Sequence, residues 1–271
     1  MQIAISCFQE TWTICILKLV CHYIAQNLMG HDSEARAAGT LGCFHKDWFY
    51  LAESQIELIQ AAKVQNPEAK YIVLGHSMGS FVARTLASKA GNLLDGLIIM
   101  GTAQMPSVIP GFGYKFASAI GTLKGDYYKS KLLDNLALGK YNDAFKPEET
   151  GVEWLSRDKE VQKRYIADPL CNYMPTTSMY KGIFQGLNYI TKKENINKIP
   201  HDLPILLIAG VKDPVGDMGA GVQRLYEIMR GTGFPNLDLR LYPDMRHELL
   251  NEIGKEAVYK DLLDWIRQVA V

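Results

Sequence analysis

The sequence has no excess of charge of either sign, which argues against several classes of partner. Its 271 residues include 29 basic and 29 acidic side chains, which cancel at neutral pH. A nucleic-acid-binding surface requires clustered lysine and arginine, and no basic stripe or acidic tail stands out. We therefore expect no nucleic-acid partner and recognition of a small molecule in a pocket, while the oligomeric state stays open.

Cysteine is scarce and is not arranged for cross-linking. The five cysteines are Cys7, Cys15, Cys21, Cys43 and Cys171, an odd number without Cys-x-x-Cys spacing. This usage favours a reducing cytoplasm over a disulfide framework. Because His, Cys and carboxylate side chains do not cluster with metal-ligand spacing, we also expect no metal and no cofactor.

Long uncharged apolar runs are missing as well. The apolar segment near the start of the chain lacks a basic region before it and is interrupted by Lys18 and His22. It resembles neither a signal peptide nor an uncharged span long enough to cross a membrane. We expect a cytoplasmic protein without stable membrane insertion.

The most informative motif is Gly-His-Ser-Met-Gly at residues 75–79. A short buried-strand pattern, 71–74, precedes it, and a helical pattern, 80–90, follows. A serine at such a strand-to-helix turn is held in a strained conformation with its hydroxyl at the end of the sheet. The helix that follows directs free N–H groups toward an oxyanion formed there. We interpret Ser77 as a nucleophile; the alternative is a strand, turn and helix without chemistry.

The remaining pattern alternates between short apolar runs and amphipathic segments. Predicted strands cover residues 2–6, 24–29, 71–74, 97–100, 203–210 and 237–242, the last of them near the edge of the sheet. Predicted helices cover residues 10–23, 47–65, 80–90, 221–230 and 255–269, and a polar loop covers 33–42. This alternation predicts an α/β fold with a mostly parallel sheet covered by helices on both faces.

The alternation stops over residues 107–198, where the sequence shows no buried strand. Helical stretches are predicted at 114–123, 129–138, 158–167 and 178–191. The segment is rich in aromatic side chains: Phe112, Tyr114, Phe116, Tyr127, Tyr128, Tyr141, Phe145, Trp154, Tyr165, Tyr173, Tyr180, Phe184 and Tyr189. We predict a helical cap at 107–198, inserted into a core of residues 1–106 and 199–271, that closes over Ser77 and forms an apolar pocket. For any single aromatic, a place in the cap's own core is the more ordinary expectation.

A serine nucleophile requires a base within hydrogen-bonding reach, and the base requires a carboxylate that orients it. In open α/β sheets these groups lie in loops beyond the carboxyl ends of strands. Asp213 and His247 each follow one of the two strands after the predicted cap, in the chain order Ser, Asp, His that this chemistry uses in α/β-hydrolases.

The other histidines fit the role of base less well. His76 lies inside the turn itself, His31 and His45 precede the nucleophile, and His201 comes before its strand rather than after it.

Among the carboxylates, Asp217 shares a loop with Asp213 and stays a rival for the orienting role. Asp244 is too close in sequence to His247 to be the usual orienting residue.

Three segments resemble the monoacylglycerol lipase and lysophospholipase type of α/β-hydrolase, whose bacterial members are often labelled serine aminopeptidase S33. They are GHSMGS at 75–80, AGVKDPV at 209–215 and YPDMRHE at 242–248. The resemblance runs from about residue 24 to the end of the chain and includes 153–158 and 167–171. It implies an α/β-hydrolase fold with Ser77 as nucleophile, His247 as base, Asp213 as orienting acid and the Met78 N–H as one oxyanion donor.

The sequence departs from this family before the nucleophile. Family members carry a His-Gly segment after their third strand that supplies a second oxyanion donor, and this chain contains no His-Gly dipeptide. The best register places residues 2–4 on that strand, Ile5 and Ser6 in place of His-Gly, and Cys7 at the donor position. Gly30-His31-Asp32 resembles the family's Gly-His-Gly loop. Only 76 residues precede Ser77, so we expect a truncated N-terminal region.

The resemblance and the apolar cap together predict hydrolysis of carboxylic esters with an apolar acyl chain, such as monoacylglycerol, lysophospholipid or short-chain esters. Two alternatives stay open. One is an amide or peptide hydrolase. The other, motivated by the missing His-Gly, is a catalytically impaired remnant that binds a ligand.

Overall fold

In the computed structural model, residues 2–6 and 22–270 are described, with side chains described from residue 24 onward. The strands are β1 (Gln2–Ser6), β2 (His22–Ala25), β3 (Tyr71–His76), β4 (Gly96–Met100), β5 (Ile205–Gly210) and β6 (Leu237–Tyr242). They form one sheet in the order β2-β1-β3-β4-β5-β6, and every neighbouring pair is parallel. The predicted parallel α/β architecture is confirmed.

The described helices are α2 (Ser33–Ala37), α3 (Trp48–Gln65), α4 (Met78–Ala90), α5 (Val108–Lys124), α6 (Lys131–Ala137), α7 (Lys159–Ala167), α8 (Thr177–Ile190), α9 (Lys193–Ile196), α10 (Ala220–Gly231) and α11 (Lys255–Ala270). Local sequence fixes several of their starts. The carboxylate of Asp47, for example, accepts a hydrogen bond from the backbone N–H of Tyr50 and so caps α3. None of these helices is both long and apolar enough to cross a membrane.

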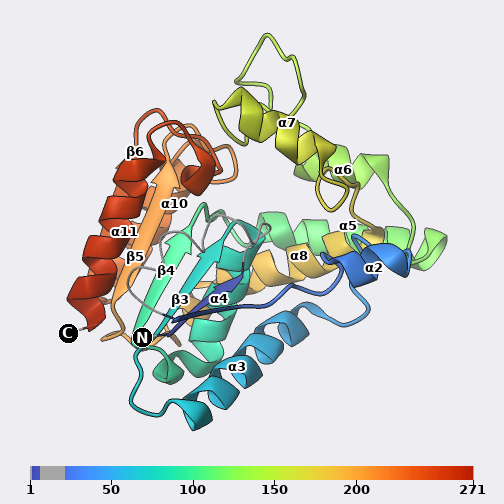
Figure 1. Cartoon of the computed structure of the whole chain (residues 1–271). Helices are drawn as coiled ribbons and strands as arrows, with labels where there is room; N and C mark the ends of the chain where they lie inside the picture. The colour runs from blue at the N-terminus through green and yellow to red at the C-terminus, as the bar shows by residue number, and fades with distance from the viewer. Residues whose placement is uncertain (1, 7–21, 271) are drawn as a thin grey trace.

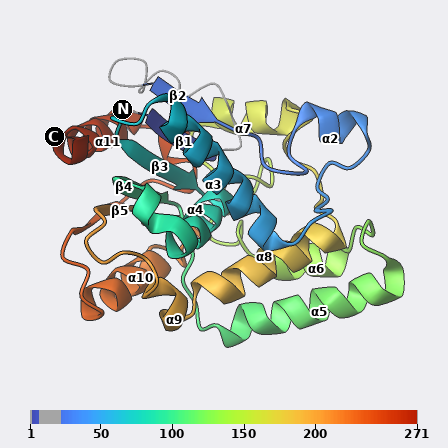
Figure 2. The same ribbon diagram turned by 90° about the horizontal axis from the view of Figure 1, so that it is seen from below.

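Alternate residues of the central strands pack into two separate cores, as a strand's two-residue period requires. Val73, Ile99 and Leu207 face a core that includes residues of α3, α4, α8 and α10. Their neighbours on the same strands, such as Ile98 and Leu206, face α11 on the opposite side. Figure 2 shows these layers, with α11 on one side of the sheet and α3, α4 and α10 on the other.

Three expectations near the start of the chain need correction. His22 and Tyr23, predicted to end a helix over 10–23, form the first half of β2, because their backbone pairs with Gln2 and Ile3 of β1. The rest of that predicted helix lies outside the described residues. The strand predicted over 24–29 ends at Ala25. The predicted loop at 33–42 begins as the short helix α2, capped by Asp32, whose carboxylate accepts from the Ala35 N–H.

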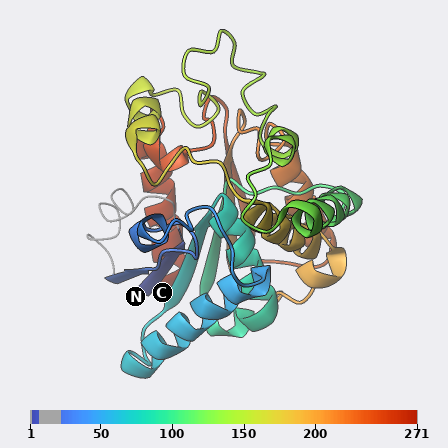
Figure 3. The same ribbon diagram turned by 90° about the vertical axis from the view of Figure 1, so that its right-hand side faces the viewer.

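Helices α5 to α9 lie between β4 and β5 in the chain. Figures 1 and 3 show α6 and α7 beyond the carboxyl ends of the strands, while α5 lies beside α8. All four helices predicted in this stretch are present, although α5 begins at Val108 rather than 114. Pro110 falls in its first turn, where a missing N–H costs no helical hydrogen bond. We call residues 107–198 the helical insertion.

Candidate active site

Ser77 lies between β3 and α4 in a backbone conformation that is rare for residues other than glycine. Its φ is 53° and its ψ is −126°, and its N–H donates to the carbonyl of Met100 on β4 at 3.0 Å. Such a conformation costs about 1–3 kcal/mol and persists only where surrounding structure enforces it. Within the described chain, the Ser77 hydroxyl caps no N–H of α4. The predicted strained turn is therefore present, with a hydroxyl not used by the helix.

Glycines at the carboxyl ends of three strands allow this turn and a second loop to approach the sheet. A Cβ on Gly75 would overlap the carbonyl oxygen of Gly79, and one on Gly210 would overlap the Met245 carbonyl. Gly101, which follows β4 with φ of 58°, would place a Cβ 3.2 Å from Cε1 of His247.

The structure brings Asp213 and His247 together from the loops after β5 and β6. Oδ2 of Asp213 lies 3.0 Å from Nδ1 of His247, and both side chains are buried. The other carboxylate oxygen of Asp213 accepts from the N–H of Val215 at 2.9 Å. This pairing leaves the Nε2 side of the imidazole to act on a substrate or nucleophile.

The electrostatic environment favours the protonated form of His247. Burial alone would lower the pKa of its imidazole, but the Asp213 carboxylate bonded to Nδ1, helped by Glu248, outweighs burial. The net result is a pKa raised above 6.5. A base of this kind accepts a proton readily and returns it while staying inside its hydrogen bond.

The rival carboxylates lie elsewhere. Asp217 is exposed and pairs with Arg224 at 3.4 Å, whereas Asp244 is exposed and pairs with Lys212 at 3.6 Å. Geometry thus favours Asp213 over Asp217 for the orienting role.

The other histidines divide into two groups. His45 and His201 are exposed. His76 donates through Nε2 to the carbonyl of His247 at 3.0 Å, and the two rings lie 4.7 Å apart. His31 lines the same cavity as Ser77, and burial lowers its pKa to about 4 although its Nδ1 lies 3.0 Å from the Met29 carbonyl. The place of His76 in the turn was expected, but its contact with His247 and the place of His31 in the cavity wall were not.

Ser77 and His247 line one cavity of about 180 Å³. The helical insertion supplies most of its apolar wall, through Leu138, Trp154, Leu155, Val161, Met179 and Ile183. Polar side chains reach it at a few points, including Glu248 and Asn251, which hydrogen bond to each other at 2.9 Å. A largely apolar cavity with few polar groups is typical of small-molecule sites.

The aromatic residues of the insertion have different fates. Trp154, Tyr165 and Tyr173 line the cavity. Tyr180 packs into the insertion's own small core, while Phe112 and Tyr127 are exposed. The prediction that the aromatic residues of the insertion line the pocket therefore holds for only some of them.

Of the two expected oxyanion donors, Met78 lies in the described structure, at the start of α4. Met78 is the first residue of α4 and lines the cavity, so its N–H belongs to the helical turn that lacks intrahelical acceptors. Cys7 lies outside the described residues. The strand that leads to it, β1, ends with Ser6 opposite Gly75 of β3. No group of three or more His, Cys, Asp or Glu side chains that could hold a metal occurs among residues 2–6 and 22–270.

The sequence model of the family described as serine aminopeptidase, S33 matches residues 28–254. The chain belongs to this family. Similar proteins include a monoacylglycerol lipase of Mycolicibacterium smegmatis, 24% identical over 256 residues, covering 90% of this chain and 82% of that protein. A monoglyceride lipase homolog of Monkeypox virus is 24% identical over 214 residues, covering 78% of this chain and 68% of the viral protein.

Solved structures confirm the α/β-hydrolase fold of this S33-family member. A carboxyl esterase from Bacillus coagulans superposes with a TM-score of 0.89 at 24% identity, covering 100% of this chain and 89% of that one. A soluble variant of the Saccharomyces cerevisiae monoglyceride lipase superposes with a TM-score of 0.73 at 15% identity, covering 100% and 87%.

Replacement of the carboxylate that contacts His247 tests the assignment of Asp213 over Asp217. We expect Asp213→Asn to lower kcat for p-nitrophenyl butyrate by about 10⁴-fold, because an amide neither holds the imidazole tautomer nor stabilises the imidazolium. Asp217→Asn, which alters only an exposed ion pair, should stay within about twofold of the parent. Initial rates of the folded variants measure both effects, and equal losses would contradict the assignment.

Proposed function

We propose that this protein is a serine hydrolase that cleaves carboxylic esters with an apolar acyl chain through Ser77, His247 and Asp213. The observation that carries the proposal is the buried contact between Asp213 and His247 on the wall of the cavity that Ser77 also lines. A strained serine at the start of a helix, lining the same cavity as a carboxylate-bound histidine, fits the arrangement that serine acyl transfer requires.

In the proposed reaction, Nε2 of His247 takes the proton of the Ser77 hydroxyl as Oγ attacks the ester carbonyl carbon. The Met78 N–H stabilises the resulting oxyanion. When the tetrahedral intermediate collapses, the C–O bond to the alcohol breaks and the leaving oxygen takes the proton from His247. Water, deprotonated by His247 in the same way, then attacks the acyl-enzyme and releases the acid and free Ser77.

Two observations support the proposed substrate class: the apolar lining of the cavity and the names of similar proteins. The cavity wall of Leu138, Val161, Met179 and Ile183 suits a hydrocarbon chain, and burial of each methylene contributes about 0.8 kcal/mol. Two similar proteins carry the names monoacylglycerol lipase and monoglyceride lipase homolog. We further propose that the helical insertion acts as the cap of this pocket, so that a monoacylglycerol-like or short-chain ester binds beneath it.

One observation favours a second candidate, an amide or peptide hydrolase. The carboxylate of Glu248 lines the cavity next to His247, and a carboxylate at that place is the group that would hold a substrate α-amine. Turnover of aminoacyl p-nitroanilides in parallel with esters separates the two candidates, because an ester hydrolase with an apolar pocket gains nothing from a charged amine there.

A panel of p-nitrophenyl esters with acyl chains from acetate to decanoate tests the proposed reaction and substrate class. We expect Ser77-dependent turnover whose kcat/KM rises with chain length until the pocket is filled, because each added methylene leaves water. Ser77→Ala should retain no more than about 10⁻³ of the parent kcat. Turnover that survives Ser77→Ala would contradict the proposed nucleophile, and a preference for acetate would contradict the apolar acyl site.

The pH dependence tests the role of His247. Because a base must be neutral to accept a proton, kcat/KM should fall as the pH drops through the pKa of His247, which is raised above 6.5. Below that pKa the decline approaches about tenfold per pH unit. This decline is measured as kcat/KM against pH with an ester that does not ionise in this range. A kcat/KM that stays constant below pH 6 would exclude His247 as the base.

A further inference from the structure

The segment that carries His247 lies between β6 and α11, and we call its residues 243–253 the histidine loop. This loop is joined to a part of the helical insertion that the proposed chemistry does not use. We call residues 153–157 the clamp segment. Its backbone carbonyls accept hydrogen bonds from the loop: the His247 N–H donates to Trp154 at 3.4 Å, and the Glu248 N–H donates to Leu155 at 2.7 Å. The indole ring of Trp154 also lies against the His247 imidazole, with ring centres 5.1 Å apart. The position of His247 therefore depends on where the clamp segment is held.

An ion pair between a partly exposed arginine and a buried glutamate fixes the far end of the clamp segment. Nε of Arg157 lies 3.0 Å from Oε2 of Glu252, and the backbone N–H of Arg157 donates to Oε1 at 2.7 Å. Nη2 of Arg157 donates to the carbonyl of Ile253 at 2.8 Å. The Glu252 side chain is fully buried. Removing one partner of such a pair leaves an uncompensated buried charge, so the contact resists separation.

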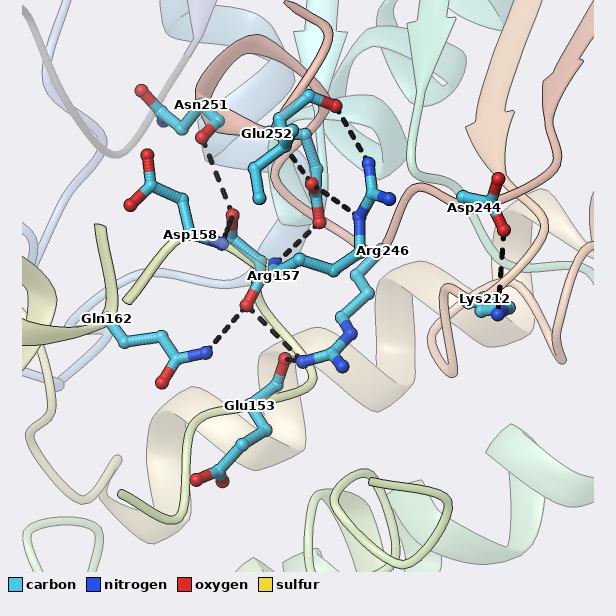
Figure 4. A network of polar contacts seen from close by, with 11 residues as sticks. Glu153, Arg157, Asp158, Gln162, Lys212, Asp244, Arg246, Asn251 and Glu252 are labelled. Atoms are coloured by element: carbon cyan, nitrogen blue, oxygen red, sulfur yellow. Dashed lines mark hydrogen bonds and ion pairs between the residues drawn. The ribbon is translucent and has the colours of Figure 1, made fainter. Parts of the chain in front are cut away.

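A second arginine, on the side of His247, reaches toward the clamp segment, as Figure 4 shows. Arg246, the residue before His247, donates through Nη1 to the Glu153 carbonyl at 2.5 Å, and its guanidinium lies 4.2 Å from the ring centre of Phe145. The loop and the clamp segment thus each extend one arginine into the other.

The clamp segment is itself held firmly at Glu153. The buried carboxylate of this residue accepts from Asn142 and from the backbone N–H groups of Glu149 and Thr150, at 2.5–2.7 Å. Burial alone would raise the pKa of this carboxyl, but these donors lower it to about 2. Glu153 is therefore ionised at neutral pH, and the clamp segment presents a fixed surface to the histidine loop.

We propose that Arg157 and Glu252 are positioning residues, which hold the clamp segment against the histidine loop and thereby keep the His247 imidazole on Asp213 and directed toward Ser77. This inference rests on the proposed function for its effect on rate. The clamp segment then cannot lift away from the core without displacing His247.

The test compares Arg157→Ala, Arg157→Lys and Glu252→Gln with the matched control Lys159→Ala. Lys159 is two residues from Arg157 but pairs with Glu149 where both side chains are exposed. We expect Arg157→Ala to lower kcat for p-nitrophenyl butyrate by about 10- to 100-fold with KM changed by less than about threefold, because a misplaced catalytic group slows chemistry more than binding. Arg157→Lys should recover part of the loss, and Lys159→Ala should stay within about twofold of the parent.

A second readout does not depend on turnover. The proton that His247 Nδ1 shares with Asp213 gives a low-field NMR resonance whose exchange with water reports how well the pair is held. Measured below the melting temperature of every variant, exchange should be faster in Arg157→Ala and Glu252→Gln than in the parent and Lys159→Ala. If Arg157→Ala does not fold, Arg157→Lys and Glu252→Gln, which nearly preserve side-chain size, provide the same comparison.

The outcomes separate the two proposals. Unchanged kcat and unchanged proton exchange in variants with lowered melting temperatures would overturn the positioning role and leave only a contribution to stability. A parent without Ser77-dependent turnover would overturn the proposed function, while the exchange comparison would still decide whether Arg157 and Glu252 hold His247.

Discussion

Asp213 and His247 come from loops 34 residues apart and share a hydrogen bond with both side chains buried. Much of the site is arranged around this contact. Glycines at the ends of β3, β4 and β5 leave room for the loops to approach the sheet, and His76 holds the carbonyl of His247 from the side of the nucleophile turn. A buried imidazole without the carboxylate would lose protons easily and serve poorly as a base; the carboxylate reverses the effect of burial on its pKa.

Ser77 also depends on the structure around it, because its backbone conformation is strained. The conformation of Ser77 is stabilised by its hydrogen bond to Met100 and by α4, which begins at the next residue and packs against the core. Because strand β3 and helix α4 are buried and well packed, they absorb the cost of one strained residue. The helical insertion then supplies the apolar wall of the cavity, and its clamp segment links this wall to the histidine loop. The histidine loop and the wall of the cavity are therefore held together by direct contacts.

Sequence patterns predicted most of the framework because its elements follow local rules. The motif at 75–79, the buried runs of β3 to β5 and the helical pattern of α3 each reflect short-range chemistry, and Ser77, Asp213 and His247 could be proposed from their positions after strands. Contacts between distant residues could not be predicted. Arg157 and Glu252 are 95 residues apart, and nothing in either neighbourhood indicates the other. His22 and Tyr23 read as the end of an apolar helix because only pairing with β1 makes them a strand. Asp213 and Asp217 were separated by the contact of Asp213 with His247 and by its burial, neither of which their shared loop reveals.

The measurement that tests the account most directly is reaction of the purified, monodisperse protein with a fluorophosphonate, read by intact mass and peptide mapping. Such probes react with a serine only when a base activates its hydroxyl and N–H donors stabilise the developing oxyanion, so labelling reports the assembled site without any assumption about substrate. The account predicts one adduct per chain, located on Ser77 and absent in Ser77→Ala. A folded protein that acquires no adduct, or acquires it on another residue, would contradict the claim that Ser77, His247 and Asp213 form a working hydrolase site.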